Sequence, residues 1–328
     1  MSAHDGHTHD ELPLLAEGDG GGCGDGCACG EEEYVTGLDP QLAALLEEAG
    51  LDPVEVEDIA TLALAEDLAG GEDVTSVATV PEAAVATADF TAREAGVVAG
   101  LRVAEAVVSL VAEEAFSVER HVEDGDRVEA GQVLLSITTR TRDLLTAERS
   151  ALNLLCHLSG IATATRAWAD AMEGTGAVVR DTRKTTPGLR ALQKYAVRCG
   201  GGANHRMGLS DAALVKDNHV VAAGGVAEAF KAVRDAYPDL AVEVEVDRID
   251  QIQPVLDAGA DLILLDNFTV PELREAVALV AGRAFLEASG GLVLADAREV
   301  AGTGVDYLAV GALTHSSPIL DIGLDLRG

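Results

Sequence analysis

From residue 149 onward, short apolar runs alternate with longer segments in which apolar residues recur at helical spacing. Helical stretches such as VPELREAVALV separate the runs. Repeated units of this kind predict a parallel sheet with helices outside it, either open or closed into a barrel. The runs that we expect to form strands are residues 176–182, 212–218, 241–247, 261–267, 283–291 and 305–312.

Each expected strand ends in residues that can bind or react. In βα barrels the chemistry lies at the carboxyl ends of the strands and on the loops that follow them. Six strands that share this feature favour a barrel over an open sheet. The residues at the strand ends are Arg183 and Lys184, Lys216, Glu245 and Asp247, Asp266, Ser289 with Gly290 and Gly291, and Gly311.

Residues 37–148 have a different organisation. A helical pattern over residues 40–68 precedes short alternating or apolar runs, which predicts an α+β layer domain. The piece VEDGDRVEAGQVLLSI is similar to the hairpin of lipoyl and biotinyl carriers. Such carriers need a lysine at the turn, and residues 94–183 contain none, so we exclude that function. A long helical stretch with Arg149 at the junction joins the two regions.

The first 36 residues are acidic and rich in glycine, with nine acidic residues and no Lys or Arg. Such a segment buries too little apolar surface to offset its ordering entropy, so we expect a disordered tail. Its side chains could instead bind Zn or Cu, although the spacing C-x3-C-x-C matches no closed structural zinc pattern. The candidate ligands are Cys23, Cys27, Cys29, His4, His7 and His9.

Charge and composition exclude several classes of protein. A net charge of -33 and a pI near 4.3 argue against nucleic acid and anionic membranes as partners. The beginning of the chain lacks the pattern of a signal peptide, and no apolar run approaches the ~18 residues needed to span a bilayer. Five cysteines without an export signal make a disulfide framework improbable. We therefore expect a cytoplasmic globular protein.

One window departs from this acidic background. Residues 180–216 hold eight basic and two acidic side chains, a net charge of +6, whereas the rest of the chain carries -39. Three of the four lysines lie in it. A local island of positive charge in an acidic chain indicates that an anion is held there. Arg190, Lys194 and Arg198, spaced four apart, are expected to form a helical stripe of surface or interface charges.

Acidic residues and glycines surround this island at the expected mouth of the barrel. Glu243, Glu245 and Asp247 share one face of their strand by alternation, and Asp266 ends the next strand. Such carboxylates suit Mg²⁺ carried with a phosphorylated substrate, or sugar hydroxyls, or they neutralise Lys216. Glycine-rich loops such as RCGGGANHR and EASGG let backbone amides approach an anion closely.

Long ordered motifs make the chain resemble one family. The segment DTRKTTPGLRALQKYAVRCGGGANHRMGLSDAALVKDNH, followed by EVEVD, LLDN, EASGG and VGALTHS, resembles quinolinate phosphoribosyltransferase, the carboxylating nicotinate-nucleotide pyrophosphorylase. EDLAGGEDVTS and ERSALNLLCHLSGIAT extend the resemblance from about residue 40 to the end. The tail with its Cys and His residues departs from the family pattern.

The resemblance implies an α/β fold in which an N-terminal α+β sandwich packs on an incomplete, TIM-like βα barrel. It divides the chain into a tail (1–36), a sandwich domain (37–148), a barrel (149–315) and a C-terminal segment (316–328) that returns to the N-terminal domain. The implied reaction takes quinolinate and phosphoribosyl pyrophosphate (PRPP) to nicotinate mononucleotide, pyrophosphate and CO2 in NAD biosynthesis. A homodimer or higher oligomer with shared active sites and Mg²⁺ as cofactor are also implied.

The resemblance also implies roles for single residues. Lys184, Lys216, Glu245 and Asp266 would be catalytic, and Glu245 and Asp266 would hold Mg²⁺ with PRPP. The quinolinate carboxylates would be bound by Arg149 across the dimer, Arg183, Lys184, His205, Arg206 and Lys216. The 5'-phosphate would be bound by Ser289, Gly290, Gly291, Gly311 and His315.

Two other functions stay open at this level. A paralogous phosphoribosyltransferase could act on a different acidic ring, and a metal-handling protein could use the N-terminal tail with the barrel as a scaffold.

Overall fold

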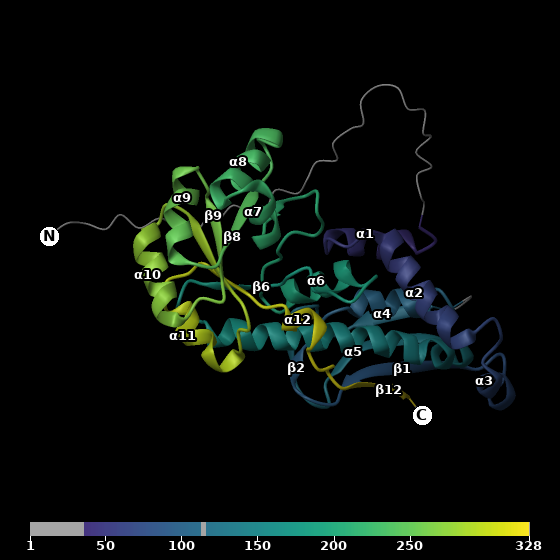
Figure 1. Cartoon of the computed structure of the whole chain (residues 1–328). Helices are drawn as coiled ribbons and strands as arrows, with labels where there is room; N and C mark the ends of the chain where they lie inside the picture. The colour runs from purple at the N-terminus through teal and green to yellow at the C-terminus, as the bar shows by residue number, and fades with distance from the viewer. Residues whose placement is uncertain (1–35, 113–115, 328) are drawn as a thin grey trace, which may run out of the picture.

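The structure is a computed structural model that describes residues 36–112 and 116–327. These residues form two lobes joined by one long helix, α5, Thr141–Ala171 (Figure 1). At about 1.5 Å per residue, the helix extends for roughly 46 Å and contributes to both lobes. The predicted tail lies outside the described residues apart from Thr36.

The N-terminal lobe begins with three helices that follow the local sequence signals closely. An aspartate precedes each helix and accepts hydrogen bonds from backbone amides of its first turn. Such caps satisfy amides that have no partner inside the helix. Proline occupies the start of the first two, where its missing N–H is not needed. The helices are α1 (Pro40–Glu48), α2 (Pro53–Leu68) and α3 (Val74–Thr79).

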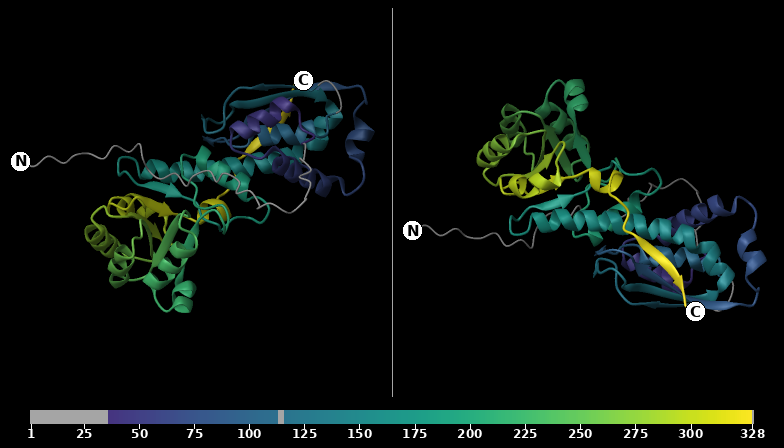
Figure 2. Two further views of the ribbon diagram at one scale, coloured as in Figure 1. Left: turned by 90° about the horizontal axis from the view of Figure 1, so that it is seen from above. Right: turned by 90° about the horizontal axis from the view of Figure 1, so that it is seen from below.

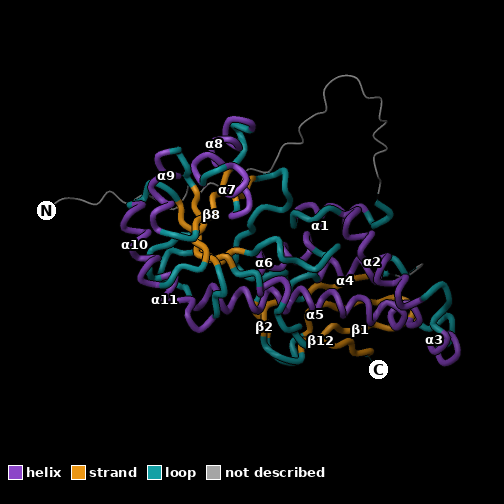
Figure 3. The backbone as a smooth tube through the Cα atoms, in the orientation of Figure 1, coloured by secondary structure: helices purple, strands orange, loops and turns teal. Residues whose placement is uncertain are grey.

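The main sheet of this lobe is antiparallel, with strand order β12-β1-β5-β3. Helices α4 (Leu101–Ser109) and α5 pack against it, so the lobe is the α+β sandwich that the sequence predicted (Figure 3). Phe90 and Ile137 are among its fully buried side chains. Its strands are β1 (Val85–Ala92), β3 (Ser117–Arg120), β5 (Val133–Arg140) and β12 (Ile322–Leu326), and β2 (Gly96–Val97) pairs separately with β4 (Arg127–Val128).

The end of the chain crosses α5 and returns to the N-terminal lobe, where β12 pairs with β1 (Figure 2). The crossing is close because residue 160 is glycine, and a Cβ there would collide with the carbonyl oxygen of Pro318. Just beyond it, the Leu320 amide donates to the carbonyl of Cys156. The absence of a side chain at Gly160 is therefore a condition of this crossing.

The C-terminal lobe contains a parallel sheet with strand order β6-β11-β10-β9-β8-β7. The two edge strands, β6 and β7, are not paired with each other, so the barrel is incomplete, as expected for the fold class. All six predicted strands are confirmed, each inside its predicted range. They are β6 (Val178–Arg180), β7 (Ala213–Val215), β8 (Val242–Val246), β9 (Leu262–Asp266), β10 (Phe285–Ser289) and β11 (Tyr307–Ala309).

Helices surround this sheet and complete the second lobe (Figure 1). Buried residues of both lobes, mainly Ala, Val and Leu, form one continuous hydrophobic core. In the described ranges, no helix has both the length and the apolar content needed to cross a membrane. The helices are α6 (Arg190–Cys199), α7 (Asp217–Ala223), α8 (Val226–Ala236), α9 (Ile252–Asp257), α10 (Val270–Val280), α11 (Ala297–Ala301) and α12 (Ala312–His315).

Candidate active site

A cavity of about 450 Å³ opens at the carboxyl ends of the barrel strands. Its walls hold basic, acidic and hydroxyl groups, whereas only a few leucine and alanine side chains are apolar. Eight residues predicted from the sequence line it: Arg183, Lys184, His205, Arg206, Lys216, Glu245, Asp266 and Ser289.

Strand order explains why these residues meet. Asp266 and Ser289 are direct partners in the register of β9 and β10, and β8 with Glu245 lies on the other side of β9. Lys216 follows β7, the next strand in the sheet. Because the strands are parallel, residues at their carboxyl ends gather at one edge even when the sequence separates them.

The cationic side chains of the cavity have unused hydrogen-bonding capacity. Among the described residues, the Nε atoms of Arg183 and Arg206 are buried and without a hydrogen-bond partner. Arg206 is anchored by Nη1, which donates to the Ala212 carbonyl at 2.9 Å. Burial, together with the nearby Arg183, lowers the pKa of Arg206. Buried N–H groups without partners indicate a place for acceptors of a ligand.

A cluster of buried ionisable groups, called the floor here, adjoins the cavity: His205 and Glu287 line it, and Glu243 and Arg180 contact these two. His205 Nε2 lies 2.5 Å from Glu243 Oε2, and Arg180 Nη1 donates to Glu287 Oε2 at 2.6 Å. Burial lowers the pKa of His205 to about 4 and raises the pKa of each of the two carboxyls to about 7. The pKa of the imidazole therefore lies well below neutral pH, whereas the pKa of each carboxyl lies close to it.

The same floor offers three possible metal ligands, because ligand atoms of His205, Glu243 and Glu287 lie within 4.8 Å of one another. The Arg180 guanidinium already bonds Glu287 and supplies a positive charge there. We therefore assign this cluster to the organisation of the floor and not to metal binding.

Glu245 and Asp266 are the acidic groups nearest to the open side. Lys216 Nζ donates to Glu245 Oε2 at 2.7 Å, and Asn267 donates to Asp266 Oδ2 at 2.7 Å. Partial burial and the neighbouring charge of Glu245 raise the pKa of Asp266. Two carboxylates that repel each other form a donor set that suits a hard divalent cation such as Mg²⁺.

Two glycine positions shape the loops after β10 and β11. Gly290 has φ +98°, and a Cβ there would collide with Asn267, so only glycine fits. A Cβ at Gly311 would lie 3.0 Å from Lys184 Cδ and 3.5 Å from His315 Nε2. The loop after β11, one of the two expected to bind phosphate, therefore lies beside Lys184.

Arg149 does not belong to this cavity. It is exposed on α5 and is absent from the residues that line the cavity of its own chain.

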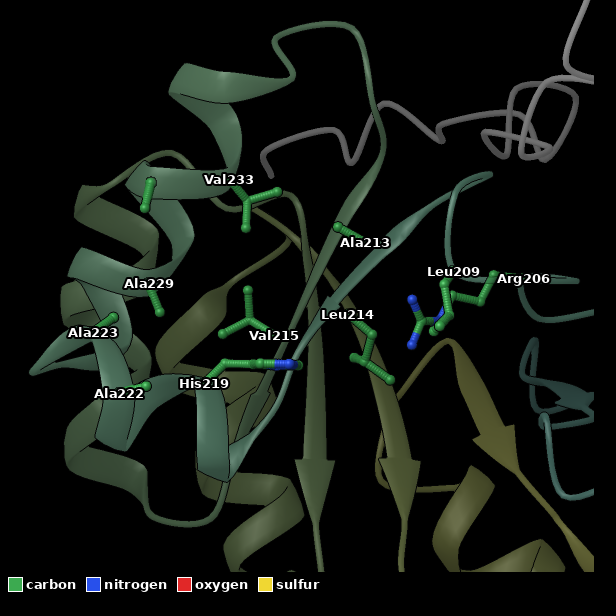
Figure 4. A pocket seen from close by; sticks show the side chains of 11 residues that line it. Arg206, Leu209, Ala213, Leu214, Val215, His219, Ala222, Ala223, Ala229 and Val233 are labelled. Atoms are coloured by element: carbon green, nitrogen blue, oxygen red, sulfur yellow. The ribbon is translucent and has the colours of Figure 1, made fainter. Parts of the chain in front are cut away.

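A second cavity of about 510 Å³ lies beside β7, α7 and α8 (Figure 4). It shares Arg206 and Leu214 with the first cavity, but most of its walls are alanine, valine and leucine. Such a lining does not suit a polyanion.

The predicted surface stripe on α6 is wrong for Lys194. This side chain is fully buried and forms an ion pair with Asp181. Arg190 donates to the Thr185 hydroxyl and to the Met207 carbonyl. Arg198 donates to the Asn204 side chain and to the Ala49 carbonyl. The three share one helical face, but only Lys194 is fully buried. Arg190 is half-buried and Arg198 is exposed, so the predicted surface position is confirmed for Arg198.

The three acidic residues that were expected to share one face of β8 lie in three different environments. Glu243 is buried and Glu245 lines the cavity, whereas Asp247 lies beyond the end of β8 and pairs with Arg248. Sequence reasoning missed Glu287, although alternation along residues 283–291 places it on the same face as Ser289 and could have revealed it.

Comparisons with known proteins agree with this geometry. The family model of the quinolinate phosphoribosyl transferase N-terminal domain matches residues 73–159, and that of the C-terminal domain matches residues 161–325. The chain is 57% identical over 272 residues to a carboxylating nicotinate-nucleotide pyrophosphorylase of Mycobacterium leprae, which covers 80% of this chain and 94% of that protein.

Two further relatives are more distant. A mitochondrial quinolinate phosphoribosyltransferase (decarboxylating) of Nicotiana tabacum is 41% identical over 292 residues, which cover 83% of this chain and 82% of that protein. The crystal structure of NadC from Streptococcus pyogenes superposes with a TM-score of 0.80 at 40% identity and covers 85% of this chain and 97% of that one.

Proposed function

Because the chain belongs to the quinolinate phosphoribosyltransferase family, we propose that it transfers the phosphoribosyl group of PRPP to quinolinate, with loss of CO2. The products are nicotinate mononucleotide, pyrophosphate and CO2, and the reaction belongs to NAD biosynthesis. One observation supports the assignment most directly. Four cationic side chains and His205 converge in one cavity of a protein whose net charge is -33.

The dicarboxylate substrate suits the inner part of this cavity. Among the residues that line the cavity, Arg183 and Arg206 have buried Nε atoms without a partner, and arginine binds carboxylates through paired N–H donors. His205 and Lys216 line the same cavity and would complete the binding of the two adjacent carboxylates. Lys184 lies where it could contact either quinolinate or a phosphate.

PRPP suits the outer part. Its 5'-phosphate would bind the loops after β10 and β11, and its ribose hydroxyls would meet the carboxylates of the cavity. Glu245 and Asp266 would also hold Mg²⁺, which, when bound, neutralises charge on the pyrophosphate. The residues proposed for the 5'-phosphate are Ser289, Gly290, Gly291, Gly311 and His315.

The reaction needs no nucleophile from the protein. As pyrophosphate leaves, positive charge develops on the ribose, and the carboxylates of Glu245 and Asp266 would stabilise it. The arginines orient the pyridine ring so that its nitrogen faces the reacting carbon. The ring nitrogen is cationic once it carries the ribose, and it stabilises the carbanion formed when the adjacent carboxylate leaves as CO2. A partly desolvated floor favours this loss of charge. The carbanion then takes up a proton from water, which gives nicotinate mononucleotide.

The position of Arg149 supports a dimer with shared active sites. The residue is exposed, does not line the cavity of its own chain, and is carried by the helix that joins the lobes. A second copy of the chain would bring its own Arg149 to the dicarboxylate. The cytoplasmic location stays a prediction.

The direct test measures nicotinate mononucleotide formed from quinolinate and PRPP in the presence of Mg²⁺. Nicotinate, which lacks one carboxylate, serves as the matched control substrate. It should leave charged donors unpaired and react with at least about a hundredfold lower kcat/KM. Equal turnover of the two acids would indicate a paralogous activity, and no product from quinolinate would contradict the proposal.

A further inference from the structure

The segment that carries His205 and Arg206 lies against the free edge of β6. Ala203 forms an isolated parallel bridge with Arg180. Its amide donates to the Val179 carbonyl at 2.9 Å, and its carbonyl accepts from the Asp181 amide at 3.2 Å. The main-chain ladder stops there because β6 itself ends at Arg180.

Two side chains continue the hydrogen bonding where the ladder stops. Asp181 Oδ1 accepts from the His205 amide at 2.8 Å, and Lys194 Nζ donates to the His205 carbonyl at 2.7 Å. Lys194 Nζ also bonds Asp181 Oδ1 directly. Both main-chain polar groups of His205 are therefore held by one ion pair.

Asn204 links the same groups from the neighbouring position. Its Nδ2 donates to Asp181 Oδ2 at 2.5 Å and to the Lys194 carbonyl at 2.8 Å. The whole arrangement joins the end of β6, the middle of α6 and residues 203–205. Its charges cancel, so it adds no net repulsion toward an anion.

Stability alone gives a poor reason for this pair. The side chains of Asp181 and Lys194 are both fully buried. The desolvation of two ions consumes most of their mutual attraction, and apolar residues of similar volume often serve stability as well or better. An apolar pair could not supply an acceptor for the amide and a donor for the carbonyl of the same residue, His205.

We propose that the Asp181–Lys194 pair positions His205 and Arg206 for the carboxylates of the acidic substrate, an inference that rests on the proposed function. Neither member lines the cavity, so each acts through the main chain of His205. With its amide and carbonyl held, the backbone directs the imidazole to Glu243 and the next side chain, Arg206, into the cavity.

The test replaces both charges together, because removal of only one would leave an uncompensated buried ion and could prevent folding. Asp181→Asn/Lys194→Met keeps the approximate volume and neutrality of the pair but removes the donor to the His205 carbonyl. We expect KM and Kd for quinolinate to rise on the order of tenfold or more, because misplaced binding groups lose affinity steeply. KM for PRPP should stay within about twofold, because its proposed contacts lie on other loops.

The matched control is the Glu105–Arg120 pair in the N-terminal lobe. Arg120 Nη2 lies 2.5 Å from Glu105 Oε2, and the Glu105 side chain is buried. Glu105→Gln/Arg120→Met removes a comparable pair far from the cavity, so it should lower Tm without raising KM for quinolinate. As a milder second variant, Asn204→Ala should raise KM for quinolinate in the same selective way.

The outcomes separate this inference from the proposed function. A wild-type chain that neither binds nor converts quinolinate overturns both. Quinolinate binding that is equal in the wild type and the Asp181/Lys194 variant overturns only the positioning role. Equal increases in KM for both substrates, or the same increase in the Glu105/Arg120 control, would mean a general structural effect and would also overturn it.

Discussion

Replacement of Lys216 by alanine tests whether Lys216 contacts the substrates or only neutralises the charge of Glu245. Lys216 Nζ lies 2.7 Å from Glu245 Oε2, and its side chain is 46% exposed while that of Glu245 is 14% exposed. The substitution removes a charged donor and leaves the Glu245 carboxylate facing two polyanionic substrates. Both effects disfavour binding and the transition state.

The magnitude follows from these two contributions. A hydrogen bond from a charged donor contributes about 1.5–3 kcal/mol. Repulsion between two unit charges at 4 Å is about 4 kcal/mol at an effective dielectric of 20, and partial exposure with salt screening reduces it to about 1 kcal/mol. We therefore expect a loss of about 2.5–4 kcal/mol, or roughly 70-fold to 1000-fold in kcat/KM.

The assay compares steady-state kcat/KM for both substrates at low and high salt. Lys231→Ala is the matched control, because Lys231 is exposed on α8 and its loss changes the net charge by the same amount. It should leave kcat/KM within about twofold, as distant surface charges usually do. Because Glu245 is itself proposed to act on PRPP, the double variant Lys216→Ala/Glu245→Gln is compared in quinolinate binding alone, where it should recover only the repulsive part, about fivefold in Kd. Full recovery in that double variant, or a wild-type rate in Lys216→Ala, would refute the reasoning.

Four further outcomes are expected. Arg149→Ala and Lys216→Ala should each be nearly inactive. After subunit exchange, a mixture of the two variants should regain about a quarter of wild-type activity, because half the dimers then hold one intact site. No recovery of activity would contradict shared active sites. The folded pKa of Glu287, about 7, exceeds its ordinary value of 4.5, so the stability that it contributes is present below pH 4.5 and lost as the pH rises through 7. In urea unfolding, the wild type should therefore lose about 3 kcal/mol relative to Glu287→Gln across that interval, and a constant difference would exclude this linkage. Burial and Asp124 raise the pKa of Cys199 to about 12, so peptide mass spectrometry should show its alkylation at pH 8 to be roughly a thousandfold slower than that of the unfolded chain. Chelation of Mg²⁺ should abolish turnover, and Asp266→Asn should raise the Mg²⁺ concentration needed for half-maximal rate; activity unaffected by chelation would remove Mg²⁺ from the proposal.

Much of the fold was accessible from local patterns. Strands and helices differ in the spacing of apolar residues, and caps such as Asp39 and Asp52 act within a single turn, so both can be recognised in a short window of sequence. The rule that barrel chemistry lies at the carboxyl ends of strands then located Lys216, Glu245 and Asp266 without coordinates. The clustering of cations between residues 180 and 216 also indicated a bound anion, because a segment of positive net charge in an acidic chain can be seen in the sequence alone.

Contacts between separate elements were not accessible in this way. Asp181 and Lys194 are 13 residues apart and lie at the end of a strand and within a helix, so their pairing depends on how α6 packs against β6. Spacing showed that Arg190, Lys194 and Arg198 share one face, but only the packed structure shows that Lys194 is buried on it while Arg198 stays exposed. The pairing of Arg180 with Glu287 likewise spans 107 residues and exists because β6, β11 and β10 are neighbours in the sheet. Periodicity reports the environment along one element, whereas burial and charge pairing are properties of the space between elements, which only the assembled barrel defines.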